Sequence, residues 1–300
     1  MSWTKEDMTQ QSGKTVVITG AHKGIGYETS LAFAENGATV ILAVSDFHKG
    51  KSIQEKILSV FPDAKVDVMY LDLNELESIH EFAKEYKTNY RTLSILILNE
   101  SIHSVQQRKT KEGFESHFGV NFLGHFALTG LLLDLLKITP NSRVITIGDK
   151  LSGKTKLSFG HFKGSKNYQP DKFYTQSKLA NLLFAKHLDE KFKEYNIQTI
   201  SVCCQTPTDS KKVDSARSKV KSSKSTSNDE VKDKEKHKFP LTVLYAATSS
   251  SLLGGEFIGP SKNKSNTPSE LSTLKKMYDK NVAHNLWQVS ENLCGVNYKF

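Results

Sequence analysis

Short apolar runs rich in β-branched residues alternate with helix-like stretches, and this alternation limits what the chain can fold into more than any other feature. The strand-like runs lie at 14–19, 38–44, 65–71, 93–98, 143–147 and 197–203. Helical patterns occupy 27–36, 52–61, 73–86, 113–137 and 174–194. Strands that are apolar on both faces and separated by helices form right-handed βαβ units. The sequence therefore predicts a doubly wound parallel sheet, a Rossmann-type three-layer αβα sandwich.

The regular pattern stops near residue 206, and this break sets the expected domain organisation. We expect an N-terminal arm at 1–12 and a single α/β domain at 13–300. That domain includes a polar, flexible insertion at 206–240 and a C-terminal helix–strand–helix segment at 241–300. Within the segment, a helix is predicted at 239–253, a strand at 254–258 and a helix at 269–294.

The chain is basic, with 41 Lys and Arg against 32 Asp and Glu and a formal net charge of +9. Much of the basic charge lies in 210–238, where Lys alternates with Ser and acidic residues and no aromatic residue occurs. Nothing there could stack on nucleic-acid bases, so a solvated loop is favoured over a nucleic-acid arm. Binding of nucleic acid or anionic lipid by this tract is the weaker alternative.

Apolar segments and cysteines indicate where such a chain would be found. The longest uncharged apolar stretch, 120–133, is too short to span a bilayer, and the N-terminus lacks an apolar signal core. Cys203, Cys204 and Cys294 cannot all pair and form no metal-ligand spacing. We therefore expect a cytoplasmic protein with no transmembrane segment and no metal.

A glycine loop, Thr19–Gly26 (TGAHKGIG), lies between the first predicted strand and the first predicted helix. Gly20, Gly24 and Gly26 permit a tight turn, close approach of the backbone to a pyrophosphate, and close packing of helix on strand. The N–H groups and partial positive charge of the helix N-terminus would then face the phosphates. A glycine turn that merely joins strand to helix is the alternative.

The spacing Gly-x-x-x-Gly-x-Gly resembles that of the short-chain dehydrogenase/reductase superfamily, and the resemblance covers about 13–205. The segments ALTGLLLDLLK, QSKLANLLFAKHL and LYAATSSSLLGGEFIG resemble retinol-dehydrogenase-like members and the oxidoreductase domain of WW-domain-containing oxidoreductases. The resemblance implies a nicotinamide dinucleotide cofactor and hydride transfer to or from a carbonyl or alcohol. It also implies dimers formed through the fourth and fifth helices.

Charge near the second strand bears on the choice between NADP and NAD. An acid at the end of that strand would bind the ribose 2′-hydroxyl and repel a 2′-phosphate, but the strand ends in Val44-Ser45 with no acid before Asp46. Lys23, beside His22, stands where NADP-preferring relatives often hold a basic residue. We therefore expect NADP(H) rather than NAD. A solvent-facing Lys23 is the alternative.

Further cofactor contacts are implied by the resemblance. It assigns the loop residues Gly20, His22, Lys23, Gly24, Ile25 and Gly26, together with Ser45, Asp72, Leu73 and Asn99, to the cofactor site. Asp72 would hold the adenine amino group, although it also suits a helix N-cap. Asn99 would brace the sheet and touch the cofactor ribose. Glu100 and Ser101 replace the small residues usual beside the cofactor, so this wall of the site is altered.

Tyr174 and Lys178 are the candidate catalytic pair. At i and i+4 of a predicted helix they share one face, and the ammonium would lower the pKa of the phenol from about 10 towards working pH. Tyr174 could then exchange a proton with a substrate oxygen during hydride transfer, and the resemblance has Lys178 bind the nicotinamide ribose as well. The spacing Tyr168-x-x-x-Lys172 also matches, but Pro170 lies between them.

Two further positions come from the resemblance. Asn121 matches the Asn that holds a water in the proton relay; a buried polar residue bonded to backbone is the alternative. Asp149 stands where relatives have the Ser that donates to the substrate oxygen. An ionised carboxylate cannot donate and would oppose phenolate formation; a protonated Asp149 or a reshaped loop carrying Ser152 are the alternatives.

Two more departures lie near the substrate. Cys204-Gln205 replaces the Pro-Gly that seats the nicotinamide carboxamide, and the polar tract 209–238 replaces an apolar lid. The departures gather at the chemical end of the site, whereas the phosphate-binding end is intact. The sequence thus supports an NADP(H)-dependent oxidoreductase acting on a carbonyl or alcohol. The alternative is a catalytically impaired relative that keeps dinucleotide binding and acts as a binding or regulatory protein.

Overall fold

The computed structural model describes residues 3–103, 106–149, 151–152, 155–195, 197–203, 238–260 and 268–300. Its strands are β1 (Thr15–Thr19), β2 (Thr39–Val44), β3 (Lys65–Tyr70), β4 (Ile95–Leu98), β5 (Arg143–Gly148), β6 (Gln198–Cys203), β7 (Phe257–Pro260) and β8 (Pro268–Glu270). Its longer helices are α1 (Gly24–Glu35), α2 (Phe47–Val60), α3 (Leu76–Asn89), α5 (Gly124–Leu131), α7 (Pro170–Phe192), α10 (Lys238–Thr248) and α12 (Lys280–Cys294). Most of the predicted insertion at 206–240 lies outside the described residues.

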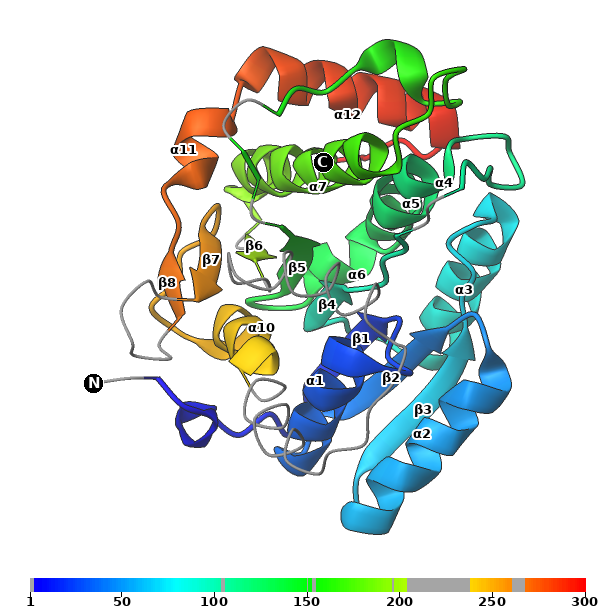
Figure 1. Cartoon of the computed structure of the whole chain (residues 1–300). Helices are drawn as coiled ribbons and strands as arrows, with labels where there is room; N and C mark the ends of the chain where they lie inside the picture. The colour runs from blue at the N-terminus through cyan, green and yellow to red at the C-terminus, as the bar shows by residue number, and fades with distance from the viewer. Residues whose placement is uncertain are drawn as a thin grey trace, which may run out of the picture.

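The eight strands form one sheet in the order β3-β2-β1-β4-β5-β6-β7-β8 (Figure 1). Each pair from β3 to β7 is parallel, and only β8 runs antiparallel, against β7. The order reverses direction between β1 and β4, as right-handed crossovers on both sides of β1 require. The predicted doubly wound sheet is confirmed.

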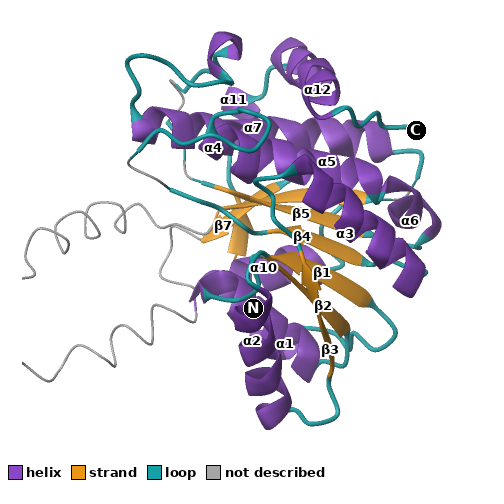
Figure 2. Ribbon diagram, turned by 90° about the vertical axis from the view of Figure 1, so that its right-hand side faces the viewer, coloured by secondary structure: helices purple, strands orange, loops and turns teal. Residues whose placement is uncertain are grey.

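Helices cover both faces of the sheet, giving three layers (Figure 2). Helices α3, α5 and α7 lie on one face, and α1, α2 and α10 on the other. Successive residues of β1 explain why both faces need cover. Val17 belongs to one hydrophobic core, Val16 and Ile18 belong to the other, and all three side chains are fully buried.

The C-terminal helix α12 forms an outer layer on α7 and α5 (Figure 1). The Trp287 ring lies 5.1 Å from that of Phe126, and the Tyr298 hydroxyl donates to the Phe126 carbonyl oxygen at 2.7 Å. This aromatic cluster ties the end of the chain to the helices that carry the site. No helix in the described part of the chain is both long and apolar enough to cross a membrane.

Several element predictions differ from the structure. The strand expected at 254–258 is β7, Phe257–Pro260, and is wrong for its first three residues. The single helix expected at 113–137 is a series: α4 (Ser116–Phe118), the π-helical turn η2 (Gly119–Leu123), α5 and α6 (Leu133–Ile138). The helix expected from 174 begins at Pro170, because proline suits the first helical position. The helix expected from 269 is wrong for its first two residues, which belong to β8; the rest comprises α11 (Thr273–Met277) and α12. Pro260 and Pro268 face each other at one end of the β7–β8 pairing, where proline is tolerated because Pro260 ends β7 and Pro268 begins the edge strand β8.

Candidate functional site

A cleft of about 360 Å³ opens at the carboxyl ends of β1, β2 and β4, where the strand order reverses. Ligands of open α/β sheets bind at such a switch point. The residues that line it are Thr19, Gly20, Ala43, Ser45, Leu71, Asp72, Leu73, Asn74, Glu100, Ile102, Arg108, Lys109, Ser116 and Val120. The cleft therefore brings together residues that follow the first four strands, and among them are the predicted cofactor-site residues Gly20, Ser45, Asp72 and Leu73.

The glycine loop closes one end of this cleft. Gly20 and Gly24 adopt positive φ of 65° and 52°, which L side chains disfavour, and α1 begins at Gly24 with its N-terminus towards the loop. Gly26 permits close packing, since a Cβ there would lie 2.7 Å from Asn99 Nδ2. Asn99 Nδ2 in turn donates to the Thr19 carbonyl oxygen at 2.8 Å. Asn99 thus braces the loop against β4.

Thr19 is a buried centre of hydrogen bonding that our site prediction omitted. Its Oγ1 accepts from the backbone N–H of Asn99 (2.8 Å) and of Glu100 (2.9 Å) and pairs with His125 Nε2 at 2.9 Å. His125 Nδ1 lies 3.1 Å from the Asn121 carbonyl oxygen, which can only accept. His125 therefore donates through Nδ1 and accepts from Thr19 through Nε2, an assignment drawn from the network.

His125 remains neutral in this network. Burial lowers its pKa to about 4, and the charge of Lys178 acts in the same direction. The side chain is 1% exposed. The geometry agrees with a neutral imidazole, because Thr19 Oγ1 already accepts two N–H groups; its hydroxyl also lies 3.4 Å from the Ile97 carbonyl oxygen.

Ser45, Asp72 and Leu73 line the end of the cleft farther from β5. Asp72 Oδ1 accepts the backbone N–H of Asn74 at 2.9 Å, and the N-cap of α3 is Glu75. The helix N-cap alternative for Asp72 is therefore wrong.

Basic side chains lie at two places around the cleft. Lys23 is exposed at the N-terminus of α1. Burial lowers the pKa of the neighbouring His22, partly opposed by the charge of Glu100. Arg108 and Lys109, which our site prediction omitted, also line the cleft. Their loop carries no motif that would single them out.

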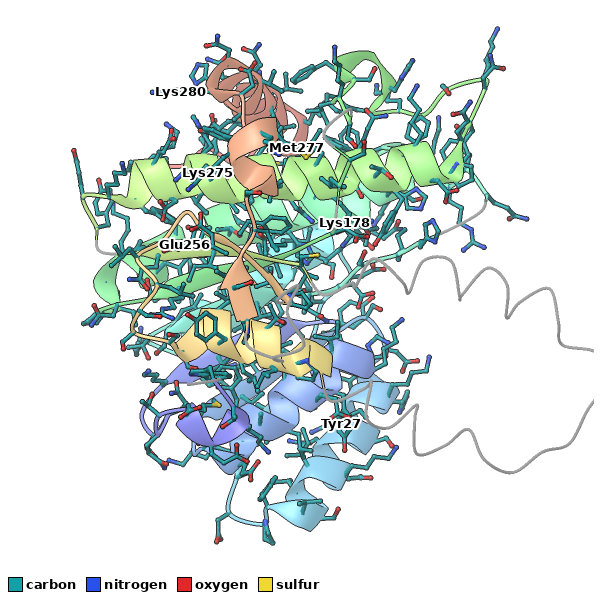
Figure 3. The ribbon with its side chains drawn as sticks, turned by 60° about the vertical axis from the view of Figure 1, so that its left-hand side comes forward. Tyr27, Lys178, Glu256, Lys275, Met277 and Lys280 are labelled. Carbon is teal, nitrogen blue, oxygen red and sulfur yellow. The ribbon has the colours of Figure 1, made fainter. Side chains whose placement is uncertain are left out.

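Tyr174 and Lys178 lie one turn apart on α7, above the end of β5. Figure 3 shows Lys178 between α7 and the sheet. Its Nζ donates to the Ile147 carbonyl oxygen at 3.3 Å and lies 5.5 Å from the centre of the Tyr174 ring. Lys178 is 3% exposed, so its ammonium acts on Tyr174 through a medium of low dielectric.

Asp149, the first residue after β5, reaches the same phenol. The Tyr174 hydroxyl donates to Asp149 Oδ2 at 3.3 Å. A hydrogen bond to a carboxylate stabilises the protonated phenol over the phenolate. Asp149 therefore acts against Lys178 on the group that both contact.

Asn121 lies fully buried in the π-helical turn η2. Its Oδ1 accepts from the Ile102 N–H at 2.8 Å, and its Nδ2 donates to the Ile102 carbonyl oxygen and to Ser177 Oγ, both at 3.0 Å. Asn181 Nδ2 donates to the Asn121 carbonyl oxygen at 3.0 Å. These contacts match a buried polar residue that joins the loop after β4 to α7.

A buried polar cluster beside Tyr174 was missing from our prediction. Glu115 accepts from the Tyr168 hydroxyl at 2.9 Å and pairs with His117 Nδ1 at 3.0 Å. Burial favours a raised Glu115 pKa, but these bonds and the N–H groups of His117 and Phe118 outweigh it and hold the pKa below its usual value. The His117 ring lies 6.0 Å from the Tyr174 ring, and the His103 ring 4.6 Å. The surroundings of the Tyr174 ring are thus partly polar.

Some predicted positions cannot be placed. Cys204, Gln205 and the tract 209–237 lie outside the described residues. Within the described ranges, no group of three or more His, Cys, Asp or Glu side chains is arranged to hold a metal ion.

A family model described as short chain dehydrogenase matches residues 14–220. Human retinol dehydrogenase 11 is 39% identical over 193 residues, covering 64% of this chain and 61% of that protein. Human polyprenol dehydrogenase is 39% identical over 179 residues, covering 58% and 54%. The WW domain-containing oxidoreductase of Gallus gallus is 38% identical over 199 residues, covering 64% and 48%. The chain thus spans about half to three fifths of these relatives.

Solved structures share the fold over a larger part of the chain. A crystal structure described as an uncharacterized protein from Mycobacterium paratuberculosis has a TM-score of 0.76 and 29% identity and covers 100% of both chains. A short chain dehydrogenase from Shigella flexneri, complexed with NADP, has a TM-score of 0.63 and 18% identity and covers 84% of this chain and 99% of its own.

Proposed function

We propose, from the premise that this chain belongs to the short-chain dehydrogenase family, that it is an NADP(H)-dependent oxidoreductase. It would transfer hydride between nicotinamide and a small carbonyl or alcohol. The observation that carries the proposal is the position of Tyr174 and Lys178 on one face of α7 at the end of β5. Asn121 joins this helix to the glycine-loop cleft, because it bonds both Ile102 of the cleft lining and Ser177 of α7. The retinol and polyprenol dehydrogenases among the relatives act, by their names, on alcohols.

The residues at the glycine loop fit a dinucleotide. A Cβ at Gly24 would meet nothing within 4 Å, so a phosphate has room to approach the first turn of α1. The free N–H groups and partial positive charge of that turn favour an anion. Asp72 and Leu73 would hold the adenine end, and Asn99 would keep the loop in place for the ribose.

Three features favour NADP over NAD. Ser45 rather than an acid follows β2, and the first acid, Asp46, caps α2 by accepting the Lys49 N–H at 3.0 Å. Lys23 is exposed beside the loop, where its ammonium can reach a 2′-phosphate. The Shigella flexneri relative in fold carries NADP.

When bound, the nicotinamide supplies or accepts the hydride. Tyr174 donates its hydroxyl proton to the carbonyl oxygen in reduction and takes it back in oxidation. Lys178 favours the phenolate that results, and its buried position strengthens this effect. The Asp149 carboxylate opposes the same change and cannot donate to the substrate oxygen, so we expect slow turnover.

A second candidate function is dinucleotide binding without turnover. The hydrogen bond from Tyr174 to Asp149 favours it, because it ties up the phenol proton that the reaction needs. The protein would then act as a binding or regulatory partner whose conformation depends on the dinucleotide.

Oxidation of NADPH by a panel of aldehydes and ketones, followed at 340 nm, tests the proposed activity. We expect Tyr174→Phe to abolish it, because the proton donor is lost, while NADPH binding is retained. We expect Asp149→Ser to raise the rate by up to about 10²–10³-fold, the usual contribution of one such donor.

Rates that are unchanged in both variants would contradict the roles of Tyr174 and Asp149. Binding of NADPH by the wild type and Asp149→Ser, with no oxidation by either, would favour the second candidate function.

A further inference from the structure

Glu100, the second residue after β4, turns its carboxylate onto the glycine loop. Its backbone is fixed by the N–H bond to Thr19 Oγ1 at 2.9 Å. Its side chain lies against Gly20: a Cβ built at Gly20 would collide with Glu100 Oε2 and lie 3.0 Å from Glu100 Cα. The carboxylate therefore covers the glycine whose bare backbone forms the start of the loop.

This carboxylate is half-buried and has no partner of its own. Among the described residues, none forms a hydrogen bond or an ion pair with it, although Arg108 and Lys109 line the same cleft. On the loop, the Glu100 carboxylate acts on His22 through its charge, which opposes the lowering of the His22 pKa by burial. A salt bridge therefore does not explain why the side chain lies there. Its carboxylate faces the cleft without a hydrogen-bonded or ion-paired partner among the described residues.

We propose that Glu100 limits the affinity of this site for dinucleotides, because its carboxylate faces the position that the anionic pyrophosphate must take. The proposal rests on the proposed function, since it assumes that the glycine loop binds a dinucleotide. A carboxylate at this position repels a second negative charge and weakens its binding. Rotation of the side chain towards solvent relieves part of this repulsion, so we expect binding to be weakened about tenfold.

Two variants separate the effect of the Glu100 charge on dinucleotide binding from the effect of its size. Glu100→Gln keeps the shape and removes the charge, whereas Glu100→Ala removes both. Glu55→Gln, on the exposed face of α2, is the matched control for loss of one negative charge. The dissociation constants of NADPH and of adenosine 2′-monophosphate are measured for all four proteins by fluorescence and calorimetry at two salt concentrations.

We expect Glu100→Gln to bind NADPH about tenfold more tightly than the wild type, and Glu100→Ala at least as tightly as Glu100→Gln. The gain should shrink at high salt, because screening weakens the repulsion. Adenosine 2′-monophosphate, which lacks the pyrophosphate, should bind equally to all four proteins, and Glu55→Gln should behave as the wild type.

The outcomes separate this proposal from the proposed function. Binding by Glu100→Gln but not by the wild type supports both. NADPH affinities within twofold of the wild type in both Glu100 variants overturn the role of Glu100 and leave the proposed function standing. Absence of NADPH binding by all four proteins at millimolar concentration contradicts both.

Discussion

His125 aligns two parts of the cleft that come from distant segments. It joins Thr19, at the end of β1, to Asn121, which is bonded through Ser177 to the helix of Tyr174. Thr19 in turn holds the backbone of Asn99 and Glu100. A change at His125 is therefore expected to shift both the glycine loop and α7.

Burial of His125 predicts a loss of stability in acid. The pKa of His125 is about 4 in the folded chain, against 6.5 as the ordinary value, so the unfolded chain binds its proton more readily. The contribution of the neutral His125 to the free energy of unfolding is fully present above pH 6.5 and is lost as the pH falls towards 4. The loss amounts to about 3 kcal/mol at most. We expect His125→Gln to flatten the dependence of unfolding free energy on pH between 6.5 and 4, measured by urea unfolding.

His80→Gln, on the exposed side of α3, is the control and should leave the pH dependence unchanged. His187, whose pKa burial also lowers to about 4, will keep part of the dependence in both variants. An unaltered slope in His125→Gln would show that His125 is not buried as a neutral base.

At this scale, the sequence could indicate residue types but not their partners. Asp149 could be found because it departs from a motif, whereas its hydrogen bond to Tyr174 depends on how α7 lies over β5. Thr19 and His125 are separated by 106 positions, and no motif marks His125, so only the fold reveals that they meet. For Asn121, the sequence left two interpretations open: the structure shows its side chain bonded to Ile102 and Ser177, and its role in a proton relay stays a prediction.

Among the elements, the first strand, glycine loop and α1 could be predicted closely, because turn chemistry and periodicity are local. The helix around Asn121 could not. Its apolar pattern is continuous, but Gly119 and Gly124 lie at the two ends of the π-helical turn, and a Cβ at Gly124 would lie 3.0 Å from the Leu73 carbonyl oxygen. The turn thus depends on the approach of another segment, as π-bulges near functional sites often do.

The glycine loop carries a prediction of its own. Gly26→Ala places a Cβ 2.5 Å from the Gly20 carbonyl oxygen and 2.7 Å from Asn99 Nδ2, so α1 or the glycine loop must shift, which costs about 1–3 kcal/mol. We expect a lower melting temperature together with weaker NADPH binding. Gly160→Ala is the control, because a Cβ there meets nothing within 4 Å. Equal stability and binding in the two variants would contradict the packing role given to Gly26.

For the whole molecule, the C-terminal segment shows that a local sequence pattern predicts a helix but not the helices on which it packs. The sequence predicts most of α12 as a helix, but not that it packs on α7 and α5 with Trp287 against Phe126. The resemblance implied dimers through the fourth and fifth helices, which correspond to this region. Helix α12 of the same chain already covers part of α5 and α7. A dimer that used the covered part would have to displace buried aromatic side chains, so we expect any dimer to use another face.

At the carboxyl edge of the sheet, the glycine loop lines the cleft through Thr19 and Gly20, and the Tyr174–Lys178 pair lies at the end of β5. We expect a dinucleotide to bind at this edge, and the excess positive charge of the chain favours binding of an anion. Lys23 is the residue through which we expect the 2′-phosphate to be recognised.

Calorimetric titration of the wild type with NADPH and with NADH tests directly whether the chain binds a dinucleotide. We expect saturable heat with both and tighter binding of NADPH; Lys23→Ala should weaken NADPH by about tenfold and leave NADH unchanged. Equal affinity of the wild type for the two nucleotides would contradict the role of Lys23. No heat and no thermal protection with either nucleotide at millimolar concentration would show that the chain does not bind a nicotinamide dinucleotide.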